Sequence, residues 1–267
     1  MIARDPSRLP APVQRRTEVI RGSHSDPDVV DRAFAGADAV FWLRPPDPTV
    51  PDAEAANRAF VEPACRAIST HRVPRVVTVS AMGRGVTAAA GLVSLAWETD
   101  DRIAATGAAV RSLALPGFMD NVLRQTASIA KDGVITEPLS PEGRRPYCAT
   151  RDIAAAAAEL LLDHSWTGYR TRAVLGPQDL SQTEMAAILS DVVGREVRFE
   201  QLPIETYRSA LLAHGFSESM AEQMVEMAVA KENGLDNAEP RTPESSSPTT
   251  FRTWCEEVLK PTLPDLG

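Results

Sequence analysis

Cysteine is scarce in this chain of 267 residues. Its three cysteines, Cys65, Cys148 and Cys255, lie far apart and lack the paired spacing of a zinc site or a disulfide framework. The four histidines are scattered as well, so we expect no metal site. Isolated thiols of this kind are typical of proteins that work in the reducing cytoplasm.

Long apolar runs and an excess of positive charge are also missing. The richest apolar tract, DIAAAAAELLLD, is too short to cross a bilayer and contains Glu159. The opening MIARDPSRLP lacks the apolar segment of a signal peptide. A net charge of -8 argues against a surface that neutralises nucleic-acid phosphates. We therefore expect a cytoplasmic protein that binds neither membranes nor nucleic acids.

Strand and helix patterns alternate over the first 120 residues. The runs TEVIRG (17–22) and AVFWL (39–43) are strand-like, and the segment between them has helical spacing. A helix over 52–73 then leads into the β-branched run RVVTVSA (75–81) and a further helix and strand. This alternation predicts βαβ crossovers and an α/β fold with a Rossmann-like, doubly wound parallel sheet.

The regular alternation of strand and helix patterns ends after residue 120. Helical patterns cover 120–135, 150–163 and 204–233, and the last of these carries Met220, Met224 and Met227 on one side, as in a cap or a partner-facing surface. We expect a Rossmann-like core over 1–120. A smaller α+β substrate lobe should then cover 121–267, with segments at about 145–176 returning to the core.

The first residues look like the end of a second strand rather than the start of a fold. In a dinucleotide-binding sheet an Arg at the end of the second strand suits the 2′-phosphate of NADP, and Arg4 follows Ile2 and Ala3 in this way. The printed chain then lacks the first strand, the glycine-rich turn and the first helix. GRG at 83–85 is no substitute, because a third glycine at the required offset is missing.

Glu98, Asp100 and Asp101 form an acidic cluster at the start of a predicted helix. Carboxylates stabilise the first turn of a helix through its dipole, and we favour this explanation. The alternative is a catalytic role.

Three longer segments together resemble one family. GADAVFWLRPPDP, FVEPACRAISTHRVPRVVTVSAMG and ETDDRIAATGAAVRSLALPGFMDN, in this order, look like the NmrA-like branch of the atypical short-chain dehydrogenase/reductases. Members of this branch bind NAD(P), usually NADP(H). The resemblance implies an NAD(P)H-dependent oxidoreductase that reduces a small electrophile such as a quinone. The alternatives are NAD(H) as the cofactor and a redox-sensing regulator without turnover.

The resemblance also implies a set of cofactor-binding residues at the carboxyl ends of the strands. Arg4 would read the 2′-phosphate, and Gly22, Ser23 and His24 would lie near the adenine. The remaining positions would line the cofactor groove and surround the nicotinamide: Leu43, Arg44, Pro45, Ser80, Ala81, Met82, Pro116, Gly117 and Phe118.

Two family features are absent from the printed chain: the GxxGxxG turn and the Tyr-x-x-x-Lys pair of the classical reductases. The first absence predicts weak NADPH binding and low stability, as in a truncated form. Because of the second, we assign no catalytic residue. The resemblance leaves a homodimer and a regulatory protein partner open.

Overall fold

Four parallel strands form the largest sheet of the computed structural model, which describes residues 1–87 and 89–264. The strands are β3 (Val40–Trp42), β4 (Arg75–Ala81), β5 (Ala109–Leu115) and β9 (Tyr169–Ala173), paired in the order β3-β4-β5-β9. Val76 and Val77 are fully buried, as expected for a β-branched strand covered on both faces. The parallel α/β architecture predicted from the sequence is confirmed.

Two short strands lie apart from this sheet. β1 (Ile2–Ala3) pairs in parallel with β2 (Ile20–Arg21), so that Ile2 lies opposite Ile20. Within residues 1–87 and 89–264, no strand pairs with the other edge of β1, nor with β3 on the side away from β4. The strand predicted at the first residues is therefore present, in a separate two-stranded unit.

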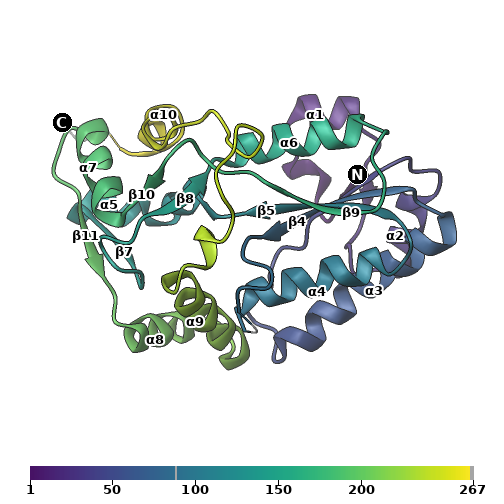
Figure 1. Cartoon of the computed structure of the whole chain (residues 1–267), viewed down its shortest axis with the longest axis horizontal. Coiled ribbons are helices and arrows are strands. Elements are labelled where there is room, and N and C mark those ends of the chain that lie inside the picture. Colours follow the sequence, from purple (N-terminus) through teal and green to yellow (C-terminus); the bar gives the residue numbers. More distant parts are fainter. Residues whose placement is uncertain (88, 265–267) are drawn as a thin grey trace.

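Helices cover both faces of the sheet (Figure 1). On one face lie α2 (Pro27–Phe34), α3 (Ala53–His71) and α4 (Leu92–Ala104), and on the other α1 (Ala11–Arg16) and α6 (Thr150–Leu162). Asp26 caps α2 by accepting hydrogen bonds from the backbone of Asp28 and Val29. A layer of apolar side chains joins α2, α3 and α4 to the sheet: Val30, Val61, Ile68, Val76, Ile103 and Val110.

The second lobe contains two smaller sheets and most of the remaining helices. β6 (Gly117–Phe118), β8 (Arg145–Cys148) and β10 (Asp179–Leu180) form one sheet, and β7 (Val134–Glu137) pairs in parallel with β11 (Arg198–Gln201). The helices of the lobe are α5 (Thr126–Asp132), α7 (Gln182–Val193), α8 (Ile204–Ala213), α9 (Glu218–Glu232) and α10 (Phe251–Trp254). Short 3₁₀ segments lie at Pro6–Arg8, Met119–Gln125, Leu235–Asn237 and Lys260–Thr262, and a π turn at Cys255–Leu259.

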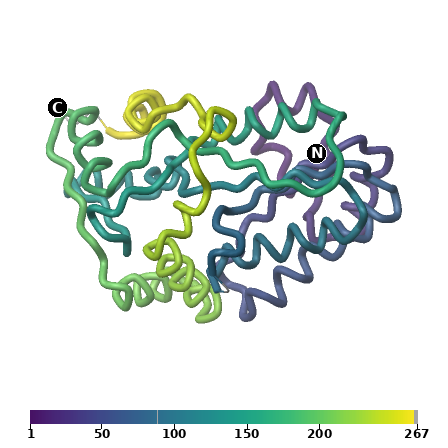
Figure 2. Tube along the Cα trace, viewed as in Figure 1, coloured from purple at the N-terminus to yellow at the C-terminus, as the bar shows by residue number. Residues whose placement is uncertain are grey.

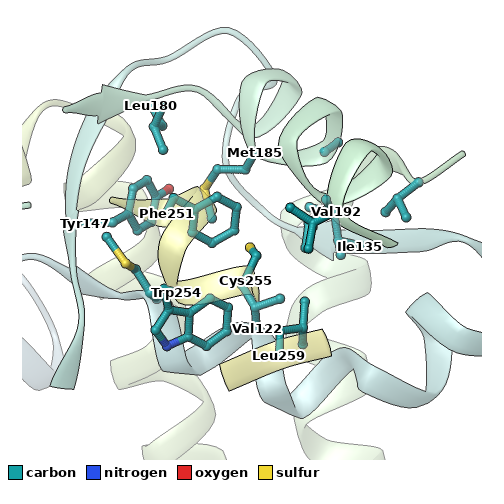
Figure 3. Packing of buried hydrophobic residues seen from close by; sticks show 14 of the residues in the cluster. Val122, Ile135, Tyr147, Leu180, Met185, Val192, Phe251, Trp254, Cys255 and Leu259 are labelled. Carbon is teal, nitrogen blue, oxygen red and sulfur yellow. The ribbon is translucent and has the colours of Figure 1, made fainter. Parts of the chain in front are cut away.

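An aromatic cluster forms the core of this lobe (Figure 3). The rings of Phe251 and Trp254 stack with centroids 5.8 Å apart. They pack among Tyr147, Met185 and Leu259, so the last helix closes onto the β8 strand and α7. The lobe is thus held by contacts between segments about a hundred residues apart in sequence.

The C-terminal segment joins the lobe to the main sheet. In Figure 2 it crosses the middle of the view, between the second lobe and the main sheet, and the backbone of Leu175 exchanges hydrogen bonds with Ser245 and Ser247. Further along, Thr249 donates its backbone N–H and its hydroxyl to Asp152 of α6. No helix of the described residues is both long and apolar enough to cross a membrane.

One expectation about local structure was wrong, and one strand was not predicted. The helix predicted over 120–135 is a 3₁₀ segment followed by α5, and it ends at Gly133, whose φ of 62° stops the helix before β7 begins. The strand that was not predicted is β8. Its four residues, Arg145–Cys148, include a proline and lack an alternating pattern, so neighbouring segments rather than local propensity determine it.

Candidate functional site

A polar cavity of about 500 Å³ opens where β1, β2 and β3 end. We call it the arginine cavity. Arg4 follows β1, Ser23 and His24 follow β2, and Arg44 and Pro45 follow β3. Ligands of open parallel sheets bind beyond the carboxyl ends of the strands, and these five lining residues lie there.

Aromatic rings form one wall of the arginine cavity. His24 stacks on Phe60 of α3 with ring centroids 6.3 Å apart, and it meets the edge of Trp42 at 5.9 Å. Burial, and then the nearby charge of Arg4, lower the pKa of His24 below its usual range. The lowered pKa favours the neutral imidazole, and the charged side chains that line the cavity are its two arginines and Asp47.

Arg44 has no protein partner within the described part of the chain. No ion pair or hydrogen bond reaches its guanidinium, and its buried Nε is unsatisfied. The guanidinium carbon lies 5.9 Å from the centroid of the Phe60 ring. Burial lowers the pKa of Arg44, whereas Asp47 acts in the opposite direction. An arginine keeps its charge under such conditions, so an unpaired cation faces the cavity.

A second cavity, of about 200 Å³, adjoins the first where β3 and β4 end. We call it the apolar cavity, since Val79 and Ala81 of β4, Val93 of α4 and Met227 of α9 line it. Helix α9 lies beside α4 below the sheet (Figure 1). The second lobe thus contributes a wall to a cavity of the core.

Among the described residues, three polar atoms of the apolar cavity's lining residues are buried without partners. They are the hydroxyl of Ser80, the indole nitrogen of Trp42 and Nε of Arg44. Buried polar groups are almost always hydrogen-bonded, so three unsatisfied groups beside one cavity make it a candidate ligand site. All three groups can donate a hydrogen bond.

The structure brings together seven of the sequence-predicted residues. Those that line a cavity are Arg4, Ser23, His24, Arg44, Pro45, Ser80 and Ala81. Gly22 precedes this loop and packs against Val29 of α2, while the side chain of Leu43 is 47% exposed and lines neither cavity. Four residues that line the cavities were not predicted from the sequence: Trp42, Phe60, Val93 and Met227. Only Met227 gave a signal, as part of the methionine stripe.

Four further predicted residues lie outside the two cavities. Met82 is fully buried and packs with Ala114 and Leu175, so its side chain points into the core. Pro116 is buried at the end of β5, while Gly117 and Phe118 form β6 and pair with β8. Contacts of these residues with a cofactor stay a prediction.

The acidic cluster does not lie at a helix start, because α4 begins at Leu92. Asp100 lies inside the helix and is fully buried, and it accepts hydrogen bonds from Thr78 (2.5 Å) and Ser112 (2.6 Å). Its carboxylate thereby fastens α4 to β4 and β5. Glu98 pairs instead with Arg58 at 2.8 Å. These contacts give both carboxylates a structural role.

A model of the NmrA-like family matches residues 12–255. The chain belongs to the NmrA-like family. One relative, 29% identical over 281 aligned residues that cover 99% of this chain and 91% of the relative, is the (4-alkanoyl-5-oxo-2,5-dihydrofuran-3-yl)methyl phosphate reductase of Streptomyces griseus. Another is the NAD(P)H azoreductase of Xenophilus azovorans, 28% identical over 85% of this chain and 76% of the relative. The family resemblance predicted from the sequence is confirmed.

Solved structures share the fold of this NmrA-like chain. The NADPH-dependent quinone oxidoreductase of Escherichia coli, complexed with NADPH, superposes with a TM-score of 0.74 at 19% identity, over 97% of this chain and 89% of that one. The triphenylmethane reductase of Citrobacter sp., complexed with NADP(H), gives a TM-score of 0.74 at 19% identity, over 94% and 87%. These likenesses confirm the Rossmann-like architecture.

Proposed function

We propose that this NmrA-like chain is an NADP(H)-dependent oxidoreductase that reduces a small, largely apolar electrophile such as a quinone. The observation that carries the proposal is the pair of adjoining cavities, one with two arginines and one with apolar walls, at the carboxyl ends of parallel strands. Relatives named as reductases, one of them NAD(P)H-dependent, support the reaction class.

The arginine cavity fits the phosphorylated adenosine of NADP(H). Arg4 stands at the end of β1, where a cation can pair with a 2′-phosphate, and His24 and Phe60 offer flat faces beside it. When bound, NADP(H) supplies the hydride. The residues of this cavity bind and orient the cofactor and do no chemistry of their own.

The apolar cavity fits a neutral, flat substrate. Its described lining contains no carboxylate and no imidazole, and Leu92, Val93 and Met227 exclude water from the space beside β4. The unpartnered Ser80 hydroxyl would donate a hydrogen bond to a carbonyl oxygen of the substrate. The residues that line the apolar cavity would therefore orient the substrate and polarise its carbonyl group, which accepts the electrons.

Calorimetric titration with NADPH and NADH, followed by the absorbance of NADPH with a panel of quinones and azo compounds, tests the proposal. We expect tighter binding of NADPH than of NADH, and steady oxidation with at least one quinone. Arg4→Met should remove the preference for NADPH without weakening NADH binding. Binding of NADPH with no oxidation across the panel would contradict the reductase and favour a regulatory protein, and no binding of either nucleotide would contradict both.

A further inference from the structure

Arg44 belongs to both cavities. Of the residues that line the arginine cavity, only Arg44 and Pro46 also line the apolar cavity. Arg4 lines only the arginine cavity, on the side of β1 and β2. Among the residues that the structure describes, Arg44 is therefore the one cation at the junction of the two cavities.

We propose that Arg44 anchors the diphosphate of the bound dinucleotide. The proposal rests on the proposed function and adds to it the residue that joins the two halves of the site. A dinucleotide has two dissimilar ends, an adenosine and a nicotinamide, and its negative charge lies on the diphosphate between them. Hydride transfer requires the nicotinamide to reach the substrate in the apolar cavity. With the adenosine end in the arginine cavity, the diphosphate must therefore pass the junction where Arg44 lies.

The surroundings of Arg44 leave its guanidinium available to such an anion. The nearest acidic residue along this loop, Asp47, already accepts hydrogen bonds from the backbone (2.9 Å) and the hydroxyl (2.8 Å) of Thr49. The described residues give Arg44 itself no hydrogen bond, and its Nε is buried and unsatisfied. A partly buried cation without a partner destabilises the folded chain, and a bidentate phosphate contact offsets that penalty.

Trp42, the last residue of β3 and two residues before Arg44, supports the same assignment. Its indole N–H is also buried without a partner beside the junction. Arg44 Nε–H and this N–H are donors, and neither group can accept a hydrogen bond. The complementary ligand group must therefore be an acceptor, as phosphate oxygens are.

Titration of Arg44→Met and Arg44→Lys in the full chain tests the assignment, with Arg4→Met as the matched control. The probes are NADPH and adenosine 2′-monophosphate, which carries the 2′-phosphate but no diphosphate. Arg44→Met loses a charged, hydrogen-bonded contact, so this variant should bind NADPH about ten- to a hundred-fold more weakly than the wild type. Binding of adenosine 2′-monophosphate should change less than about twofold in this variant. Arg4→Met should weaken both ligands.

Arg44→Lys keeps the charge but loses the fork of donors, so we expect an intermediate loss of NADPH affinity. Thermal unfolding gives a second readout: without ligand, Arg44→Met should unfold at the same temperature as the wild type or higher, while the stabilisation by NADPH should decrease. Equal loss of both ligands would place Arg44 at the 2′-phosphate and overturn the assignment, as would unchanged NADPH binding. If the wild type binds no NADPH, the proposed function is contradicted as well. If the wild type binds NADPH and Arg44→Met binds it equally well, only the Arg44 assignment is contradicted.

Discussion

The two cavities differ in how the chain builds their walls. The arginine cavity lies at the ends of β1, β2 and β3, strands of only two or three residues, and loop residues form much of its surface. The apolar cavity lies at the end of β4, a seven-residue strand whose centre is fully buried, and two helices from different lobes cover it. The charged groups of the arginine cavity thus lie on loops, whereas packed strands and helices determine the shape of the apolar cavity.

This difference has an energetic consequence. Arg44 lies over the Phe60 ring but makes no hydrogen bond or ion pair among the described residues, so it can be replaced with little effect on folding, because few native contacts are lost. A residue beneath the apolar cavity holds helices and strands together, and its replacement affects the cavity through the stability of the fold. Substitutions around the first cavity should therefore reduce binding, and substitutions beneath the second should reduce stability.

The largest effect is expected for Asp100→Ala. It leaves the hydroxyls of Thr78 and Ser112 without their acceptor inside the protein, and it removes the buried partner of Arg84. Breaking such a buried network should lower the free energy of unfolding by roughly 3 to 5 kcal/mol in urea denaturation. Asp101→Ala, at an exposed ion pair with Arg84, is the control and should lower it by less than about 1 kcal/mol. Equal effects would refute the structural role of Asp100.

Leu113→Ala should have the next largest effect. Leu113 lies in β5, is fully buried and packs against α6, so its truncation should lower the free energy of unfolding by about 3 kcal/mol. Ile20→Ala in the half-buried β2 strand should lower it by roughly half as much, because less apolar surface is lost. Urea denaturation of both variants beside the wild type checks the ratio of the two losses in free energy of unfolding. A larger effect at Ile20 would show that the two-stranded unit contributes more to stability than the main sheet.

Gly91→Ala should disturb the apolar cavity itself. Gly91 precedes α4 with a φ of 54°, and a Cβ there would collide with the backbone carbonyl of Gln223 in α9. We expect a loss of about 2 kcal/mol from strain and displacement of α9, together with weaker quinone binding. Gly107→Ala, at a φ of 88° but in open space, should cost only about 1 kcal/mol and leave the quinone KM unchanged. An unchanged quinone KM in Gly91→Ala would show that α9 does not line the substrate-binding site.

The smallest effect concerns the pH dependence of stability at His24. Its pKa in the folded chain lies below the ordinary value of 6.5, so the unfolded chain binds this proton more readily. The contribution of neutral His24 to stability is complete above pH 6.5 and is lost as the pH falls through the folded pKa. The difference in urea midpoint between wild type and His24→Asn should therefore shrink or reverse as the pH falls from 7 toward 5. A difference that grows over this range would contradict the lowered pKa.

The sequence by itself determined the features that depend on local pattern. Periods of two and of 3.6 residues predicted the alternating strands and helices and the parallel sheet, and the ends of the strand-like runs at Leu43 and Ala81 indicated where we expect ligand-binding residues. The family resemblance rested on the same succession of segments. Because β-branched runs and capping residues act over a few neighbours, they can be read without knowing the fold.

Only the tertiary structure decided which of those residues meet. It turned Met82 into the core, buried Asp100 beneath the sheet and brought Met227 of α9 to a cavity formed by β4. It also gave Arg44 its position between two cavities and, among the described residues, no hydrogen bond or ion pair. These outcomes depend on packing between segments far apart in the chain, and local sequence patterns carry no information about such contacts.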